Sequence, residues 1–308
     1  MTDSKAIIEP AIPAAKQGED RGESTVLMAP LLIAEGLRHR AALTGLVVEL
    51  AARSARFRRS LPPGLHTALS RLVQSVDCYY SNLIEGHDTH PVDIERALKN
   101  DYSADPAKRN LQLEAKAHIT VQEWIDAGGL RGKAAKIEGI CDVHQRFAEL
   151  LPEDLLWTED PESGERMKVT PGAVRHKHVK IGQHIPISPG AVPRFLARFE
   201  SVYSKLGKTD TILAAAAAHH RLLWIHPFLD GNGRVARLMS YAMLLETLDT
   251  GGVWPIARGL ARNVSQYKAP RCALRFQPHC PRGGCRGYSR RRQHEKMLSA
   301  PSPLRIHG

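Results

Sequence analysis

Residues 226–237 read His-Pro-Phe-Leu-Asp-Gly-Asn-Gly-Arg-Val-Ala-Arg, and this stretch decides both the fold and the chemistry that we predict for the chain. One short loop holds a histidine, His226, that could accept a proton and a carboxylate, Asp230, that could bind a metal ion. A Gly-Asn-Gly turn and two arginines follow directly. A carboxylate beside a glycine-rich turn and an arginine pair favours binding of a nucleotide's phosphates with their metal ion.

Two helical patterns flank this loop. Residues 209–225 are rich in strong helix formers, with Thr209 or Asp210 as the expected N-cap. Pro227 cannot lie inside a helix, so the first helix ends just before it. Apolar residues at helical spacing over 235–245 predict a second, buried helix. The loop therefore connects two helices.

The Gly-Asn-Gly turn then lies at the N-terminus of the second helix. Glycines let the backbone point its N–H groups inward, and the helix dipole adds partial positive charge. Such a site favours a phosphate. Arg234 and Arg237, at positions i and i+3 of the helix, can reach the same ligand.

At every position, residues 226–237 resemble the Fic (filamentation induced by cAMP) motif, His-Pro-Phe-x-(Asp/Glu)-Gly-Asn-Gly-Arg-x-x-Arg. The resemblance implies an enzyme that transfers AMP from ATP, with Mg²⁺, to a Ser, Thr or Tyr hydroxyl of a target protein. His226 would be the general base, and Asp230 would hold Mg²⁺ between the phosphates. The nucleotide would be bound by a backbone nest, one amide side chain and two cations: Gly231, Asn232, Gly233, Arg234 and Arg237.

A second helical stripe, over 66–85, ends in Ser-Asn-Leu-Ile-Glu-Gly, with Gly86 placed to end the helix. Glu85 would lie in the last turn, where the helix dipole disfavours a carboxylate, so we expect a compensating cation elsewhere. Ser81-x-x-x-Glu85-Gly86 resembles the inhibitory signature (Ser/Thr)-x-x-x-Glu-(Gly/Asn) of Fic proteins with an N-terminal inhibitory helix. The resemblance implies that Glu85 pairs with Arg237 and blocks the γ-phosphate, so the isolated protein is expected to be weakly active.

Residues 179–187 alternate between apolar and other side chains, as an extended segment or short hairpin does. Gly182 and Pro186 argue against a central strand. The resemblance implies a β-hairpin flap at about 175–188 that would clamp an extended target segment by strand addition. The apolar flap residues that would dock the target are Val179, Ile181 and Ile185, and the basic residues of the approach are Arg175, His176, Lys177, His178 and Lys180.

The predicted fold is all-α, a Fic-type helical domain with this small β-hairpin flap. We expect a disordered N-terminus (1–25), N-terminal helices (26–130) with the inhibitory helix at about 66–86, and a Fic core (131–267). A loop over 151–175 would lead into the flap. Helical patterns fall at about 31–57, 66–85, 92–100, 110–126, 133–150, 190–206, 209–225 and 233–248.

The net charge of +11 is concentrated in one appendage. Residues 268–308 carry ten Lys and Arg against one acidic residue, so they supply +9 and leave +2 for residues 1–267. A near-neutral body argues against a nucleic-acid-binding protein. The tail itself is expected to be disordered or to result from a shift of the reading frame near Lys268.

Cysteine usage and the chain start favour a cytoplasmic protein. The count of five cysteines is odd, and the first residues lack the charged-then-apolar pattern of a secretory signal. No apolar stretch approaches the length of a membrane span, so we predict no membrane partner.

The sequence leaves other functions open. The same site could remove AMP from a modified protein, with Glu85 orienting a water molecule, or transfer another phosphate-containing group. A non-enzymatic regulator that binds DNA through the tail is disfavoured, because no helix-turn-helix pattern is present. We expect a protein target and auto-modification, and the sequence leaves a homodimer open.

Overall fold

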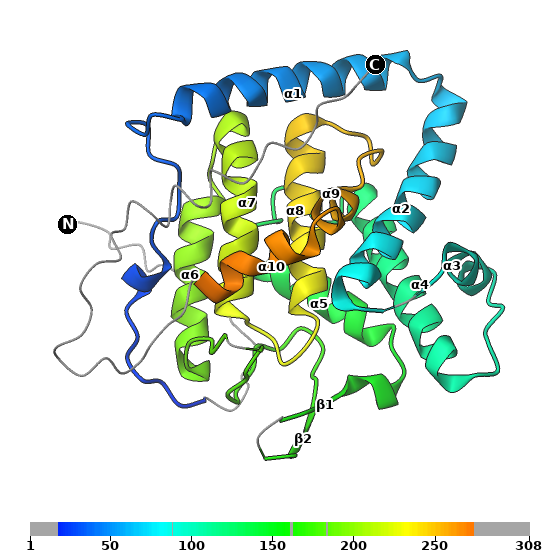
Figure 1. The fold of residues 1–308 in the computed structure, drawn as a ribbon, viewed down its shortest axis with the longest axis vertical. Helices are drawn as coiled ribbons and strands as arrows, with labels where there is room; N and C mark the ends of the chain where they lie inside the picture. Colours follow the sequence, from blue (N-terminus) through cyan, green and yellow to red (C-terminus); the bar gives the residue numbers. More distant parts are fainter. Residues whose placement is uncertain (1–17, 88, 161–162, 183, 274–308) are drawn as a thin grey trace, which may run out of the picture.

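The computed structural model describes residues 18–273, except residues 88, 161–162 and 183. Within them the chain is mainly α-helical with one small hairpin, which confirms the predicted fold class (Figure 1). No helix in these ranges combines the length and apolarity needed to cross a bilayer. In chain order the elements are η1 Thr25–Met28, α1 Arg40–Ser60, α2 Pro63–Glu85, α3 Pro91–Leu98, α4 Pro106–Asp126, α5 Ile137–Glu149, η2 Glu153–Leu156, β1 Trp157–Glu159, β2 Arg166–Lys168, η3 Pro189–Ala191, α6 Val192–Tyr203, α7 Lys208–Ile225, α8 Asn232–Leu248, α9 Ile256–Ala261 and α10 Val264–Ala273.

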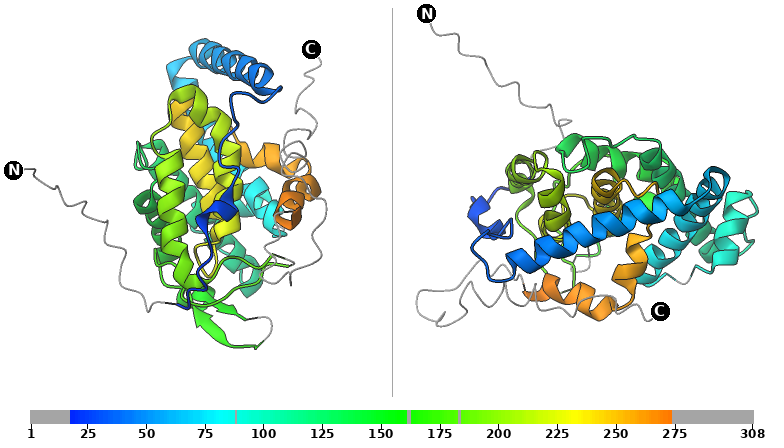
Figure 2. Two further views of the ribbon diagram at one scale, coloured as in Figure 1. Left: turned by 90° about the vertical axis from the view of Figure 1, so that its left-hand side faces the viewer. Right: turned by 90° about the horizontal axis from the view of Figure 1, so that it is seen from above.

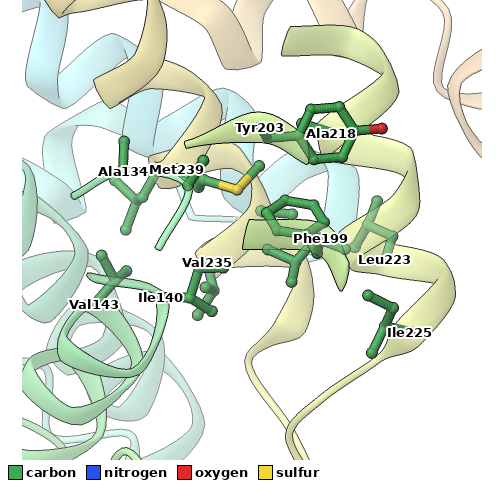
Figure 3. Packing of buried hydrophobic residues seen from close by; sticks show 14 of the residues in the cluster. Ala134, Ile140, Val143, Phe199, Tyr203, Ala218, Leu223, Ile225, Val235 and Met239 are labelled. Carbon is green, nitrogen blue, oxygen red and sulfur yellow. The ribbon is translucent and has the colours of Figure 1, made fainter. Parts of the chain in front are cut away.

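Helices α7 and α8 lie side by side at the centre and make the most extensive contact between any two described helices. Helix α7 buries Ala214, Ala215 and Ala218, and such small side chains allow neighbouring helices to approach closely. Helix α8 is buried along most of its length. Figure 3 shows Val235 and Met239 of α8 packed among side chains of α5, α6 and α7.

Helix α1 crosses one end of this central pair (Figure 2). Arg40, at its start, forms an ion pair with Asp210 in the first turn of α7, at 2.6 Å. Further along α1, Ser54 donates a hydrogen bond to the carbonyl of Leu248 at the end of α8, at 3.2 Å. The loop that joins α7 to α8 therefore lies at the opposite end of the molecule from α1.

The start of α7 differs from the prediction. The helix begins at Lys208 after the N-cap residue Gly207, so neither Thr209 nor Asp210 is the N-cap. Tertiary structure explains the difference, because the carboxylate of Asp210 is used by the ion pair with α1.

Residues 18–25, which were predicted to be disordered, have a defined structure. Glu23 is buried there, and its carboxylate accepts hydrogen bonds from the amide and the hydroxyl of Ser188, at 2.7 and 2.5 Å. Arg194 donates to the carbonyl of Glu23 at 2.7 Å. The prediction of disorder is wrong for these residues, because contacts distant in the sequence fix them. Residues 1–17 lie outside the described part.

The helical pattern was predicted to break after Lys268, but α10 continues to Ala273. The rest of the predicted tail, residues 274–308, lies outside the described residues.

The two strands, β1 and β2, form an antiparallel hairpin within the segment that was predicted as a loop (Figure 1). Each strand has three residues, too few for a period-two pattern to be recognised in the sequence. The predicted flap at 175–188 instead holds one isolated β-bridge between Ile181 and His184. Gly182, in the left-handed region at φ 57°, and Pro186 prevent longer pairing there.

Asp77 joins α2 to α9. Its Oδ1 accepts a hydrogen bond from the amide of Ala257 at 2.7 Å, and the carboxyl group is buried. Burial raises the pKa of Asp77 to about 6, although the Ala257 amide and Arg237 act in the opposite direction. The folded protein therefore holds a proton on Asp77 more tightly than the unfolded chain does.

The burial of Asp77 gives a pH-dependent contribution to the free energy of unfolding that Asp77→Asn removes. With a pKa of about 6 when folded and 3.8 as the reference value, the contribution is complete below pH 4 and is lost as the pH rises to 6. We expect the unfolding free energy of the wild type minus that of the variant to fall by roughly 2–3 kcal/mol over this window. Urea unfolding at a series of pH values measures it. A difference that is flat or rises with pH contradicts the assignment.

Candidate active site

His226 ends α7 at the edge of the site. It adopts the left-handed conformation, φ 52°, and its amide donates to the carbonyl of Leu222 at 3.0 Å, so the helix ends where the sequence predicted. The ring is partly exposed, and its Nδ1 lies 3.4 Å from the carbonyl of Leu223. A non-glycine residue in this conformation costs free energy. The surrounding loop must therefore hold it.

Asn232 closes the loop. Its Oδ1 accepts from the amide of Phe228, and its Nδ2 donates to the carbonyl of the same residue, both at 2.9 Å. The Phe228 ring is fully buried and stacks on His144, with ring centroids 3.9 Å apart. Burial lowers the pKa of His144 to about 4, so this ring is neutral near pH 7. The side chain of Asn232 therefore holds the loop through both of its polar atoms.

Helix α8 begins in this loop. Gly231 is its N-cap residue, with φ 78°, a conformation that favours glycine. Asn232 and Gly233 form the start of the first turn, and Asp230 is exposed just before it. The N-terminus of a buried helix therefore opens beside His226, as the sequence predicted for the phosphate site.

Arg237 points from α8 to α2. Its Nη2 donates to Oε1 of Glu85 at 2.6 Å, and its Nε donates to the hydroxyl of Ser81 at 2.8 Å. The guanidinium is buried, which lowers its pKa, but Glu85 and Tyr267 outweigh this effect and raise the pKa of Arg237 above its ordinary value. The pair expected from the sequence is therefore present, as an ion pair between a buried guanidinium and a partly exposed carboxylate, 152 residues apart in the chain.

Gly86 ends α2 beside this pair, in the left-handed conformation at φ 90°, as predicted. The Glu85 carboxylate lies directly against the first turn of α8. A Cβ atom on Gly233 would lie only 2.2 Å from Oε1 of Glu85, so this position must be glycine for the carboxylate to fit. The carboxylate thus lies where the sequence predicted an anion.

Arg234, the other motif arginine, has partners that the sequence did not reveal. It forms an ion pair with Glu114 of α4, lies 3.3 Å from Nδ1 of His87, and stacks over the Phe147 ring at 5.1 Å. Burial acts to raise the pKa of Glu114, but His87 and Arg234 together have the larger, opposite effect. The pKa of Glu114 therefore lies below its ordinary value. Glu114 is 120 residues from Arg234 in the chain, and no local pattern singled it out.

The predicted position of Arg175 is also wrong. It was expected on the basic approach to a flap, but it is buried and binds the end of α7. Its Nε donates to the carbonyl of His226 at 2.7 Å, and its Nη2 donates to the carbonyls of Ile187, at 2.6 Å, and Ile225, at 3.4 Å. Burial lowers its pKa to about 10. Arg175 therefore holds the loop that positions His226.

Replacing Arg175 with methionine should lower the free energy of unfolding by roughly 3 kcal/mol, because several buried carbonyls lose a charged donor. Lysine should restore little, since one ammonium cannot reproduce the guanidinium geometry. Urea unfolding measures both effects. Arg198→Met, on the exposed side of α6, is the matched control and should change stability by less than about 0.5 kcal/mol. A loss below 1 kcal/mol for Arg175→Met would contradict this role.

The segment predicted to dock a target follows Arg175. Val179 and Ile181 are partly buried and Ile185 is exposed. His184 fixes the segment, with Nε2 3.0 Å from the carbonyl of Trp224. The segment lies beside the end of α7, and target docking on it stays a prediction.

Comparisons with known proteins agree with this geometry. The model of the Fic/DOC family matches residues 134–244. The proteins named "Protein adenylyltransferase Fic" from Drosophila willistoni and Drosophila melanogaster are each 29% identical to this chain, over 171 and 169 residues. Each alignment covers 54% of this chain and 31% of the relative, so the chain matches about a third of the length of these proteins.

Solved structures share the fold. A Fic family protein from Desulfovibrio desulfuricans superposes with a TM-score of 0.59 at 16% identity, over 78% of this chain and 67% of that chain. A fragment of Fic-1 from C. elegans superposes with a TM-score of 0.51 at 18% identity, over 76% of this chain and 71% of that chain.

Proposed function

Because residues 134–244 form a Fic/DOC family domain, we propose that this chain transfers AMP from ATP to a hydroxyl group of a protein. One observation carries the proposal. A buried arginine, Arg237, pairs with the carboxylate of Glu85, which lies against the first turn of α8. A site that holds a carboxylate through a guanidinium beside a helix N-terminus has the chemistry to hold a phosphate.

The reaction follows from the positions of the groups. His226 removes the proton of the target hydroxyl, whose oxygen attacks the α-phosphorus of ATP. A bond forms between this oxygen and phosphorus, the bond to the bridging oxygen breaks, and pyrophosphate leaves. The backbone at Gly231 and Gly233 and the cations Arg234 and Arg237 bind the phosphates and neutralise their charge.

Asp230 fits the expected role of a Mg²⁺ ligand. It is an exposed carboxylate at the mouth of the phosphate site. The described residues contain no cluster of three metal-binding side chains, but Mg²⁺ often uses one or two carboxylates together with substrate phosphates. Asp230 would therefore hold the ion with the nucleotide, and the bound ion would neutralise charge on the phosphates.

Glu85 would regulate this reaction. It uses Nη2 of Arg237, which the nucleotide also needs, and Ser81 holds Nε of the same guanidinium. While the pair is intact, ATP cannot place its terminal phosphate there. A form of the protein with this pair intact would therefore be inhibited.

The decisive experiment uses Glu85→Gly protein with ATP labelled in the α- or the γ-phosphate. Label should enter protein from α-labelled ATP alone, and mass spectrometry should show AMP on a Ser, Thr or Tyr hydroxyl. Label from the γ-phosphate would contradict the proposal. Loss of AMP from a pre-modified protein, without any gain from ATP, would favour the reverse reaction.

A further inference from the structure

We propose that Glu114 of α4 is a positioning residue that orients Arg234 for the phosphates of ATP; the inference rests on the nucleotide site proposed above. Glu114 lies outside the segment 134–244 that the family model matches. Its carboxylate forms an ion pair with Nη2 of Arg234. Only 15% of the Glu114 side chain and 8% of the Arg234 side chain are exposed. Because little water reaches either group, each depends on the other to compensate its charge.

Two further contacts fix this arrangement. The Phe147 ring of α5 supports the face of the Arg234 guanidinium, whose central carbon lies 5.1 Å from the ring centroid. Nδ1 of His87 lies 3.2 Å from Oε2 of Glu114, so the carboxylate is held from a second side. The guanidinium is planar, and contacts at one edge and one face together define its orientation.

The ion pair leaves part of the guanidinium for a ligand. Nε of Arg234 is buried and has no hydrogen-bond partner among the described residues. A buried donor without an acceptor costs free energy, so an anion that supplies the acceptor is bound more tightly. Because a guanidinium has several N–H donors, the Glu114 carboxylate and a phosphate oxygen can bind different nitrogens of Arg234 at the same time.

Glu114 and Glu85 therefore act in opposite directions. Glu85 is the last residue of α2, and its carboxylate lies against the first turn of α8, where the phosphates are expected. Glu114 lies within α4, away from both ends of that helix. A change at the end of α2 can release Glu85, but it leaves α4 in place. Glu114 then still orients Arg234 for the nucleotide.

The test is a double-mutant cycle on nucleotide binding in the Glu85→Gly protein. Dissociation constants of a non-hydrolysable ATP analogue are measured calorimetrically for this parent, for Glu114→Gln, for Arg234→Met and for the double variant. We expect Glu114→Gln to weaken binding about tenfold, as for loss of one hydrogen bond between charged groups. In the Arg234→Met protein the same substitution should change binding by less than about twofold, because Glu114 acts only through Arg234.

Three results overturn the proposal. Equal weakening by Glu114→Gln with and without Arg234 would show that Glu114 acts through the general structure of the protein. Unchanged binding in Glu114→Gln would show that Arg234 needs no such partner. Tighter binding would show that Glu114 competes with the phosphates, as is proposed for Glu85.

Glu200→Gln is the matched control. Glu200 of α6 is also a partly buried glutamate, and its carboxylate accepts a hydrogen bond from the amide of Ile137 at 2.8 Å. Ile137 is the first residue of α5, at the opposite end of that helix from Phe147. This variant should bind the analogue as the parent does.

Two more conservative variants decide the matter if the first ones do not fold. Glu114→Asp keeps the charge but withdraws the carboxylate by one methylene group, and Arg234→Lys keeps the charge without the planar guanidinium. The same cycle with these variants has the same deciding results. All readouts are binding constants, so they stand even if the Glu85→Gly protein transfers no AMP; that result would contradict only the proposed function.

Discussion

Replacing Glu85 with glycine is expected to raise the rate of AMP transfer about 10- to 100-fold. The substitution releases Nη2 of Arg237 from a partly buried carboxylate, and a charge-assisted hydrogen bond of this kind contributes about 1.5–3 kcal/mol. The rate of auto-modification with α-labelled ATP measures the effect. The α2 backbone tolerates glycine at this position, because Glu85 is the last residue of the helix and Gly86 already ends it, but the loss of the carboxylate from the buried Arg237 should lower the free energy of unfolding.

Two further variants separate charge from structure. Glu85→Gln keeps the shape and removes the charge, so it should activate in the same direction as glycine but less strongly. Glu95→Gln, at an exposed position of α3, is the matched control and should leave transfer unchanged. Transfer that does not increase in either Glu85 variant, although both proteins are folded and bind ATP, would exclude inhibition by this pair.

Loss of the general base should have the opposite effect. In the Glu85→Gly protein, His226→Asn is expected to lower AMP transfer by about 10²–10⁴-fold, the usual contribution of general-base catalysis. Asparagine is the suitable replacement because it tolerates the left-handed backbone at φ 52°, where alanine would add strain. Binding of the ATP analogue should remain, because the phosphate-binding groups are intact.

His90→Asn is the control for this experiment. His90 is exposed and is the N-cap residue of α3, a position that asparagine suits. It should not change transfer. Full activity of His226→Asn would show that another group takes the proton.

The motif loop shows what local sequence can predict. Pro227 and the glycines of the turn determine where α7 ends and where α8 begins, because each acts through its own backbone conformation. The position of Gly86 likewise predicted the end of α2. The prediction placed the hairpin in the wrong segment, because no local signal marks the true one. The strands at 157–159 and 166–168 have three residues each, too few to show an alternation of apolar and polar side chains.

The sequence by itself determined most of the helices, the ends of α2 and α7, and the set of groups at 226–237, because these depend on residues within a few positions of each other. Tertiary structure alone decided that Glu114 binds Arg234 and that Arg175 holds the end of α7. The chain has 43 Lys and Arg and 32 Asp and Glu, so many pairs are chemically equivalent in the sequence. Burial of α8 between α2, α4 and α7 selects among them, since a buried charge is tolerated only where the fold brings a partner to it.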